Sequence, residues 1–222
     1  MLRQICFAAL MAVVVVRNAS AQAATRLAVA PRSTLSLAGS SNVAAWRCTG
    51  NTLLGAMEIA APIDRINDVI DRIENGDIAV WMADPARARF PRPQFELEIP
   101  VDALRCSGGK PMERDLHAAL KAGSFPSIRF ELRELRGAVT HDIDAHTYEA
   151  HIVGELSIAG ATRPLEIVAS AQRVARDRFR LRAVMPLKMT DFGIVPPRAL
   201  FGLVRAADDL TVTFDLLLET RS

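Results

Sequence analysis

The sequence has no large excess of charge of either sign. Its 222 residues include 27 basic and 25 acidic side chains, a formal net charge of +2. A nucleic-acid partner requires a basic face that neutralises phosphates. The charge balance gives no support for such a face, so we expect no nucleic-acid partner.

Long apolar runs are scarce. Residues 5–16 form an uncharged apolar run, but it is too short to cross a bilayer as a helix, which takes about 20 residues. No second apolar stretch is long enough to span either. We therefore predict that the chain does not span a membrane.

The run at residues 5–16 fits a targeting segment. Arg3 precedes it, and small residues follow at Ala19, Ala21 and Ala23. A basic start, an apolar centre and a small-residue cleavage site are the three parts of a secretory signal peptide. We predict a cleaved signal peptide at 1–23, a single domain at 24–222, and a periplasmic or secreted protein. The signal removes two arginines and no acid, which leaves the mature chain with no net charge.

The sequence also lacks the companions that catalytic motifs need. Asp191-Phe192-Gly193 matches the metal-binding triplet of protein kinases, but no glycine-rich loop, strand lysine or catalytic-loop Asp/Asn pair accompanies it. There is no Gly-x-Ser-x-Gly motif either. Asp208 and Asp209 are adjacent, so on a strand their side chains would point to opposite faces. We predict that the chain is not an enzyme and needs no cofactor.

Cysteine is rare, with three in the chain. Cys6 lies in the predicted signal peptide, which leaves Cys48 and Cys106. In an exported protein an even pair suggests a disulfide, which would stabilise the fold by about 4 kcal/mol on the chain-entropy model. Two buried free thiols are the alternative. A metal site is less favoured, because the two cysteines have no nearby partner ligands.

The dominant pattern in the sequence is alternation of apolar and polar residues. Strict alternation is typical of half-buried strands, with apolar side chains inward. The segments that show it are 94–101, 127–135, 154–160, 164–170, 179–189 and 210–218, and 33–46 adds one or two strands. Many such strands joined by short turns indicate an antiparallel sandwich or barrel. The periodicity is compatible with both.

Two segments have helical spacing instead. Residues 62–76 and 111–123 each place apolar side chains on one helical face and end at a glycine. We predict two short amphipathic helices that pack against the sheet. The basic, proline-rich segment 84–94 is read as a solvated connector.

Three histidines, His141, His146 and His151, suggest a metal site at first sight. Their spacing of five puts neighbouring histidines on opposite faces of a strand, and the segment begins like a polar turn. A solvated hairpin is the favoured interpretation, and we predict no metal ion.

Four blocks of the sequence resemble the YceI-like family of exported, lipocalin-like, polyisoprenoid-binding proteins. They are "GSSNVAAW" (39–46), "MERDLHAALKAGSFPSIRFEL" (112–132), "GELSIAGATRPLEI" (154–167) and "MTDFGIVPPRALFGLVRAADDLTVTFDL" (189–216). They run in family order over most of the mature chain. The region 55–93 looks longer than in simpler members of the family.

The resemblance implies an all-β fold, an elongated eight-stranded antiparallel lipocalin-like barrel with one or two short helices. It also implies a tunnel for an apolar lipid and allows a homodimer. The segment 191–202 would form the barrel mouth, where Lys188, Asp191 or Arg198 could touch a polar head. The expected tunnel and mouth residues are Trp46, Leu97, Ile99, Ile128, Phe130, Leu156, Ile158, Met189, Phe192, Ile194, Phe201 and Phe214.

These observations lead to one function hypothesis and two alternatives. The first is a non-enzymatic carrier of an isoprenoid or similar amphiphile, such as a quinone, polyprenol or fatty acid derivative. The second is a non-catalytic interaction or stress-related scaffold whose barrel is filled by its own side chains. The third and least favoured is a hydrolase or metal-dependent enzyme that uses the histidines of 141–151.

Overall fold

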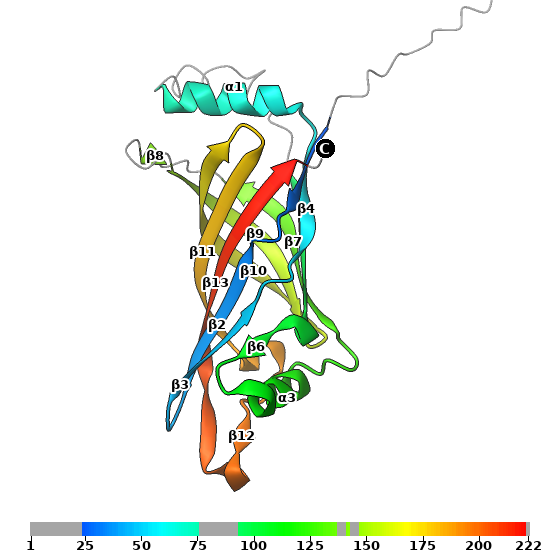
Figure 1. Cartoon of the computed structure of the whole chain (residues 1–222), viewed down its shortest axis with the longest axis vertical. Helices are drawn as coiled ribbons and strands as arrows, with labels where there is room; N and C mark the ends of the chain where they lie inside the picture. Colours follow the sequence, from blue (N-terminus) through cyan, green and yellow to red (C-terminus); the bar gives the residue numbers. More distant parts are fainter. Residues whose placement is uncertain (1–23, 76–92, 137–140, 143–146, 221–222) are drawn as a thin grey trace, which may run out of the picture.

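The alternating segments form one antiparallel sheet that closes on itself (Figure 1). A computed structural model describes residues 24–75, 93–136, 141–142 and 147–220. Closure follows from β13, which pairs with β11 on one side and with β1 on the other. The barrel strands, in order around the wall, are β1 (Thr25–Val29), β4 (Leu54–Ile59), β5 (Gln94–Pro100), β7 (Ser127–Arg136), β9 (Thr147–Ile158), β10 (Ala161–Ala175), β11 (Arg178–Lys188) and β13 (Val204–Thr220). The predicted eight-stranded antiparallel barrel is confirmed.

The strand that pairs with one edge of β13 changes along the length of β13. At one end β13 pairs with β1, and further along it pairs with β2 (Thr34–Ser41). β2 pairs with β3 (Ala45–Gly50), which pairs with the two-residue β6 (Arg105–Cys106). The short β8 (His141–Asp142) pairs with the start of β9, and β12 (Arg198–Ala199) pairs with the start of β13.

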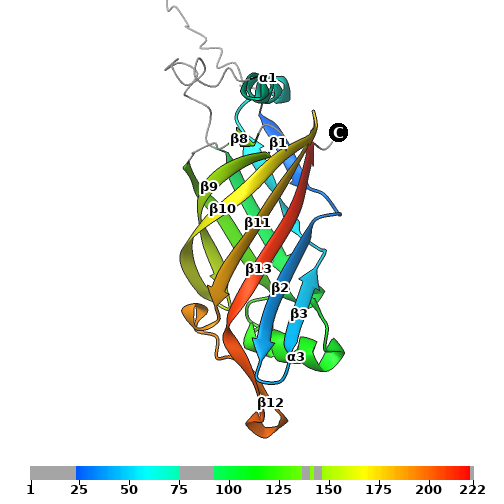
Figure 2. The same ribbon diagram turned by 90° about the vertical axis from the view of Figure 1, so that its left-hand side faces the viewer.

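A helix lies at each end of the barrel (Figures 1 and 2). α1 (Ile63–Glu74) lies across one end, and α3 (Gly109–Ala119) lies beside the wall at the other. We call these the α1 end and the α3 end. The part of the chain that the structure describes also contains the 3-10 turns η1 (Val101–Ala103), η2 (Thr190–Phe192) and η3 (Leu200–Gly202). Both helices were predicted within a few residues.

The core lies inside the barrel, on the apolar side of the alternation. In β5, Phe95, Leu97 and Ile99 are buried, whereas Gln94 and Glu96 are exposed. The same alternation places Ile128 and Phe130 inside and Arg129 and Glu131 outside. Inward burial of these side chains is the main stabilising contribution, at roughly 25 cal/mol per Å² removed from water.

Candidate ligand-binding cavity

The barrel encloses a cavity of about 510 Å³ near its α3 end. This volume falls within the range of small-molecule sites, about 300 to 1,000 Å³. The inward residues of the wall that line it are Leu35, Leu37, Cys48, Ile99, Ile128, Leu156, Ile158, Met185, Leu187, Leu210, Val212 and Phe214. The cavity reaches solvent where its lining includes exposed residues such as Ala44, Gly108 and Pro111.

The lining is almost free of charge. Its charged members are Asp115 and Lys188, and both are exposed. Lys188 Nζ lies 2.6 Å from Asp209 Oδ1, and this hydrogen bond raises the pKa of Lys188. The charge of Lys188 is therefore balanced by the carboxylate of Asp209. The interior therefore suits an apolar chain, and the charged groups suit only the rim.

Helix α3 supplies one side of the cavity. Met112, Leu116 and Ala119 lie on the lining and also pack against the barrel core. Their spacing of four and three places them on one helical face. The sequence predicted this face but assigned it only to packing against the sheet, so its contribution to the cavity was missed.

A disulfide holds α3 at this position. Cys48 of β3 and Cys106 of β6 are bonded, and their Cα atoms are 4.0 Å apart. The predicted disulfide is confirmed. The backbone N–H of Cys106 also donates to Glu113 Oε1 at 3.2 Å, which ties α3 to β6. Cys48 is 1% exposed and lines the cavity itself.

Trp46 lies on the lining because a glycine faces it. Gly39 is its cross-strand partner, and a Cβ at Gly39 would lie 2.3 Å from the indole ring. Only glycine leaves room for this ring position. The indole N–H donates to the carbonyl of Ser40 at 3.1 Å, which fixes the other edge of the ring.

The Asp-Phe-Gly segment closes part of the cavity and has no metal-binding arrangement. Phe192 is 4% exposed and lies on the lining, after which Gly193 turns the chain with φ 66°. Asp208 accepts hydrogen bonds from the backbone and hydroxyl of Thr190, at 2.9 and 2.6 Å. These bonds lower the pKa of Asp208. They anchor the start of the segment to β13.

The structure brings most of the predicted ligand-binding residues together. The predicted residues on the lining are Trp46, Ile99, Ile128, Leu156, Ile158, Met189, Phe192, Ile194 and Phe214. Leu97 and Phe130 are buried in the core but do not line this cavity. The ring of Phe130 lies against Gly154 and 6.3 Å from the ring of Phe95, so it packs within the wall side chains.

Phe201 is the clear departure from the predicted mouth. It is fully exposed and does not line the cavity. Its backbone has φ 57°, a left-handed conformation at the turn η3. The structure therefore does not place Phe201 with the predicted residues that line the cavity.

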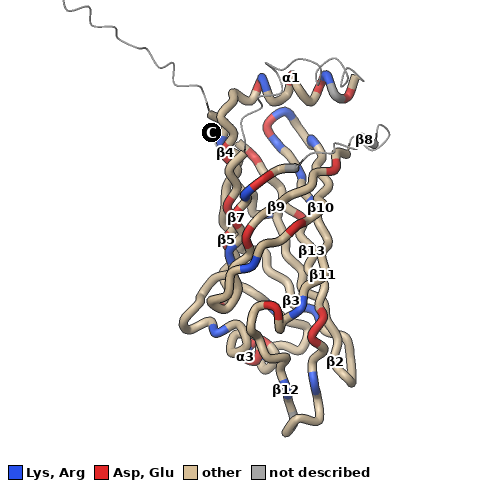
Figure 3. The backbone as a smooth tube through the Cα atoms, turned by 180° about the vertical axis from the view of Figure 1, so that it is seen from behind, with Lys and Arg blue, Asp and Glu red and all other residues tan. Residues whose placement is uncertain are grey.

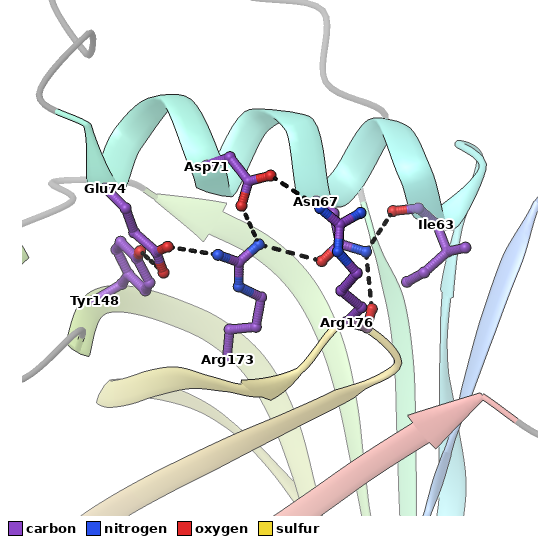
Figure 4. A network of polar contacts seen from close by, with 7 residues as sticks. All are labelled: Ile63, Asn67, Asp71, Glu74, Tyr148, Arg173 and Arg176. Carbon is purple, nitrogen blue, oxygen red and sulfur yellow. Dashed lines mark hydrogen bonds and ion pairs between the residues drawn. The ribbon is translucent and has the colours of Figure 1, made fainter.

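At the α1 end, a polar network joins α1 to the barrel strands (Figure 4). Arg173 of β10 bonds both Asp71 and Glu74 of α1, and the Tyr148 hydroxyl donates to Glu74 at 2.9 Å. Burial, and then the neighbouring Glu74, raise the pKa of Tyr148. The amide of Asn67, 1% exposed, donates to the carbonyls of Ile63 and Arg176. The network joins α1 to the β10–β11 hairpin and β9.

The histidine segment is partly described. β8 and β9 pair at His141–Asp142 and Tyr148–Thr147, which agrees with the expected hairpin, and His151 is exposed. His146 lies outside the described residues, as do the predicted signal peptide and residues 84–92. Within the described ranges, no group of three or more His, Cys, Asp or Glu residues could hold a metal ion. In the same ranges, no helix is long and apolar enough to cross a membrane.

The comparisons with known proteins agree with the barrel. The family model of the YceI-like domain matches residues 54–218. A polyisoprenoid binding domain from Saccharophagus degradans, implicated in plant cell wall breakdown, aligns with a TM-score of 0.62 at 11% identity, covering 89% of this chain and 99% of that one. BcnA of Burkholderia cenocepacia aligns with a TM-score of 0.56 at 15% identity, covering 83% and 95%. No curated protein matched the sequence.

Proposed function

The chain belongs to the YceI-like family, and from that premise we propose that it binds an isoprenoid or similar amphiphilic lipid in the cavity at the α3 end. It acts as a carrier without catalysis. After removal of a signal peptide at residues 1–23, it works in the periplasm or outside the cell.

The size and the lining of the cavity support a lipid ligand. A cavity of about 510 Å³ is lined by apolar side chains, with Asp115 and Lys188 as its charged members. The alternative, a scaffold protein whose barrel is filled by its own side chains, would leave no such space. The relative described as a polyisoprenoid binding domain supports the ligand class by analogy.

The physics of burial makes a catalytic group unnecessary for affinity. Transfer of one CH₂ from water into an apolar site contributes about 0.8 kcal/mol. An isoprene unit therefore contributes roughly 3–4 kcal/mol before the ordering losses of binding. A few units suffice for tight binding. A polar head would remain at the rim, within reach of Lys188, Asp191 or Arg198, all of which are exposed.

Two neighbouring alanines of α3 provide a matched test. Ala119 is half-buried and lines the cavity, whereas Ala118 is exposed. Ala119→Phe should fill cavity space and lower the affinity for a short-chain quinone at least about tenfold, since it removes room for several carbons. Ala118→Phe should bind as the wild type does. Equal affinities for the two variants would contradict a ligand in this cavity.

A further inference from the structure

Two hairpins extend the α3 end beyond the cavity. One is the turn between β2 and β3, residues 42–44, and the other runs from Ile194 through β12 and η3 into β13. Figures 1 and 2 show the second hairpin as the outermost feature of this end. We call residues 42–44 and 195–205 together the tip.

The tip displays large apolar side chains to solvent. Phe201, Val195 and Leu203 are the three most exposed large hydrophobic residues of the described chain, at 110%, 77% and 73%. Val43, at 66%, belongs to the same tip. Single exposed hydrophobic residues are ordinary on protein surfaces, but a group of them at one projecting end indicates a binding surface.

Hydrogen bonds hold the two hairpins together. Asn42 Nδ2 donates to the carbonyl of Leu203, and the backbone N–H of Arg205 donates to Asn42 Oδ1, both at 2.8 Å. Arg205 Nε donates to the carbonyl of Gly202 at 3.0 Å. The two hairpins of the tip are therefore held together by specific hydrogen bonds.

Phe201 has a strained backbone conformation. Its φ of 57° is uncommon for a bulky residue, and such strain persists where the surrounding structure enforces it. The apolar cavity lies close by, yet the fold turns this aromatic ring outward. The geometry thus favours a surface role for the ring over a packing role.

The charge of the tip is of one sign. Residues 42–44 and 195–205 contain Arg198 and Arg205 and no acidic residue. Of the nearest acidic residues along the chain, Asp208 accepts hydrogen bonds from Thr190, and Asp209 pairs with Lys188. Arg198 and Arg205 are exposed, and neither forms an ion pair with a described carboxylate. Figure 3 shows basic and no acidic positions on the projecting hairpin. The tip as a whole therefore carries positive charge beside exposed apolar side chains.

The tip is also continuous with the cavity. Ala44 and Val204 line the cavity, and each is next in sequence to an exposed residue of the tip, Val43 or Leu203. Pro197 and Ala199, on either side of Arg198, line it as well. A surface bound to the tip would therefore lie next to the cavity opening.

We propose that the tip docks on an anionic phospholipid surface, with Phe201 and Leu203 entering the headgroup boundary and Arg198 contacting phosphates. Amphipathic elements bind membranes by this combination of apolar and basic groups. Transfer of lipid between bilayer and cavity at the docked tip rests on the proposed function, but the docking itself does not.

A second copy of this chain fits the tip less well. A symmetric dimer brings the same patch of both copies together. The arginines of two tips would then face each other without an acidic partner from either tip, which is unfavourable. A bilayer that contains anionic lipid supplies both the apolar layer and the opposite charge.

Vesicle sedimentation tests the docking. The wild-type mature chain should bind vesicles of phosphatidylglycerol and phosphatidylcholine in equal parts, and it should bind more weakly at high salt or without phosphatidylglycerol. Phe201→Asn with Leu203→Ser should weaken binding at least about tenfold; asparagine is chosen because it tolerates positive φ. Arg198→Gln should weaken it roughly five-fold.

Two barrel-wall residues provide the control. Val168 of β10 and Val184 of β11 are also exposed, at 51% and 66%. Val168→Ser with Val184→Ser removes the same number of apolar side chains away from the tip and should leave vesicle binding unchanged. Circular dichroism should show every variant folded, since all the altered side chains are exposed.

Three outcomes would overturn docking: no vesicle binding by the wild type, equal binding by the tip and wall variants, or tip-dependent dimers in place of vesicle binding. Lipid uptake from solution is measured separately. Phe201→Asn with Leu203→Ser should take up a short-chain quinone as the wild type does, because neither residue lines the cavity. Docking without any uptake would contradict the proposed function and leave the docking proposal intact.

Discussion

Cys48 and Cys106 occupy directly opposed positions of β3 and β6, with their Cα atoms 4.0 Å apart and a disulfide between them. Their bond joins segments separated by 58 residues of sequence. It fixes the chain that leads into α3, and α3 forms one side of the cavity. We therefore expect this one covalent link to affect both the stability of the fold and the proposed ligand binding.

Removing the disulfide should weaken both properties. In Cys48→Ser with Cys106→Ser, the free energy of unfolding should fall by about 4 kcal/mol, because the unfolded chain regains the freedom of a 58-residue loop. Urea unfolding followed by circular dichroism measures the loss. Quinone affinity should fall as well, since α3 loses its anchor. An undiminished affinity would show that α3 is held without the bond.

The close fit of Trp46 on Gly39 gives a spectroscopic test. Trp81→Phe leaves Trp46 as the sole tryptophan, and its emission should change when ligand enters the cavity that it lines. Gly39→Ala in this background should displace the ring, because the new Cβ would lie 2.3 Å from it. The displaced ring should report ligand with a smaller change and lower affinity. Emission that is indifferent to ligand in both proteins would place binding elsewhere.

The network at the α1 end predicts unequal roles for two arginines. Arg173, with a side chain 16% exposed, bonds Asp71 and Glu74, whereas Arg176 is 72% exposed and lies 3.6 Å from Asp71. Arg173→Met should destabilise the docking of α1 by roughly 2 kcal/mol. Arg176→Met should cost less than about 1 kcal/mol.

Hydrogen exchange measures this difference directly. The amides of α1 should exchange faster in Arg173→Met than in Arg176→Met, while those of β5 and β7 remain protected in both. Equal exchange in the two variants would mean that apolar contacts such as Ile66 hold α1, without help from the network.

The pairing of Asp215 with Arg180 predicts a dependence on pH. Hydrogen bonding to Arg180, at 2.6 Å from its Nε, lowers the pKa of Asp215. Its stabilising contribution is therefore present above the ordinary carboxyl pKa of about 3.9 and is lost as pH falls through the lowered value. Asp215→Asn should reduce stability by about 1 kcal/mol at pH 7.

Thermal unfolding across pH tests the sign of this effect. The difference between Asp215→Asn and the wild type should shrink as the pH approaches 3. Glu58→Gln, which removes the more exposed pair with Arg26, should change stability less than Asp215→Asn does at pH 7. A difference for Asp215→Asn that grows on acidification would contradict the assigned role of the ion pair.

Much of the barrel was predictable because period-two alternation is a local signal. The segments around Phe95, Ile128 and Val212 alternate strictly, and each is a barrel strand with its apolar side inward. β1 and β4 escaped prediction for physical reasons. Leu27, Ala28 and Val29 are all buried, so β1 does not alternate, and β4 includes Gly55, a weak strand former.

The sequence predicted that the cavity would be lined by apolar side chains, but not which buried residues would lie outside it. An apolar inward face predicted the lining residues of the strands, such as Ile99 and Leu156. Nothing local indicates that Phe130 packs on Gly154, since the two residues meet only through the pairing of β7 with β9. Nothing local indicates either that Asn42 bonds Leu203 and Arg205, which follow Phe201 in the second hairpin.

The cavity at the α3 end is proposed to hold an apolar lipid. The most direct measurement is mass spectrometry of an organic extract of the protein, purified from its native host cells, with Ala119→Phe prepared in parallel. We predict a long-chain isoprenoid-like lipid in stoichiometric amount from the wild type and much less from the variant. An empty extract from the folded wild type, with no uptake of added quinones or polyprenols, would contradict the claim.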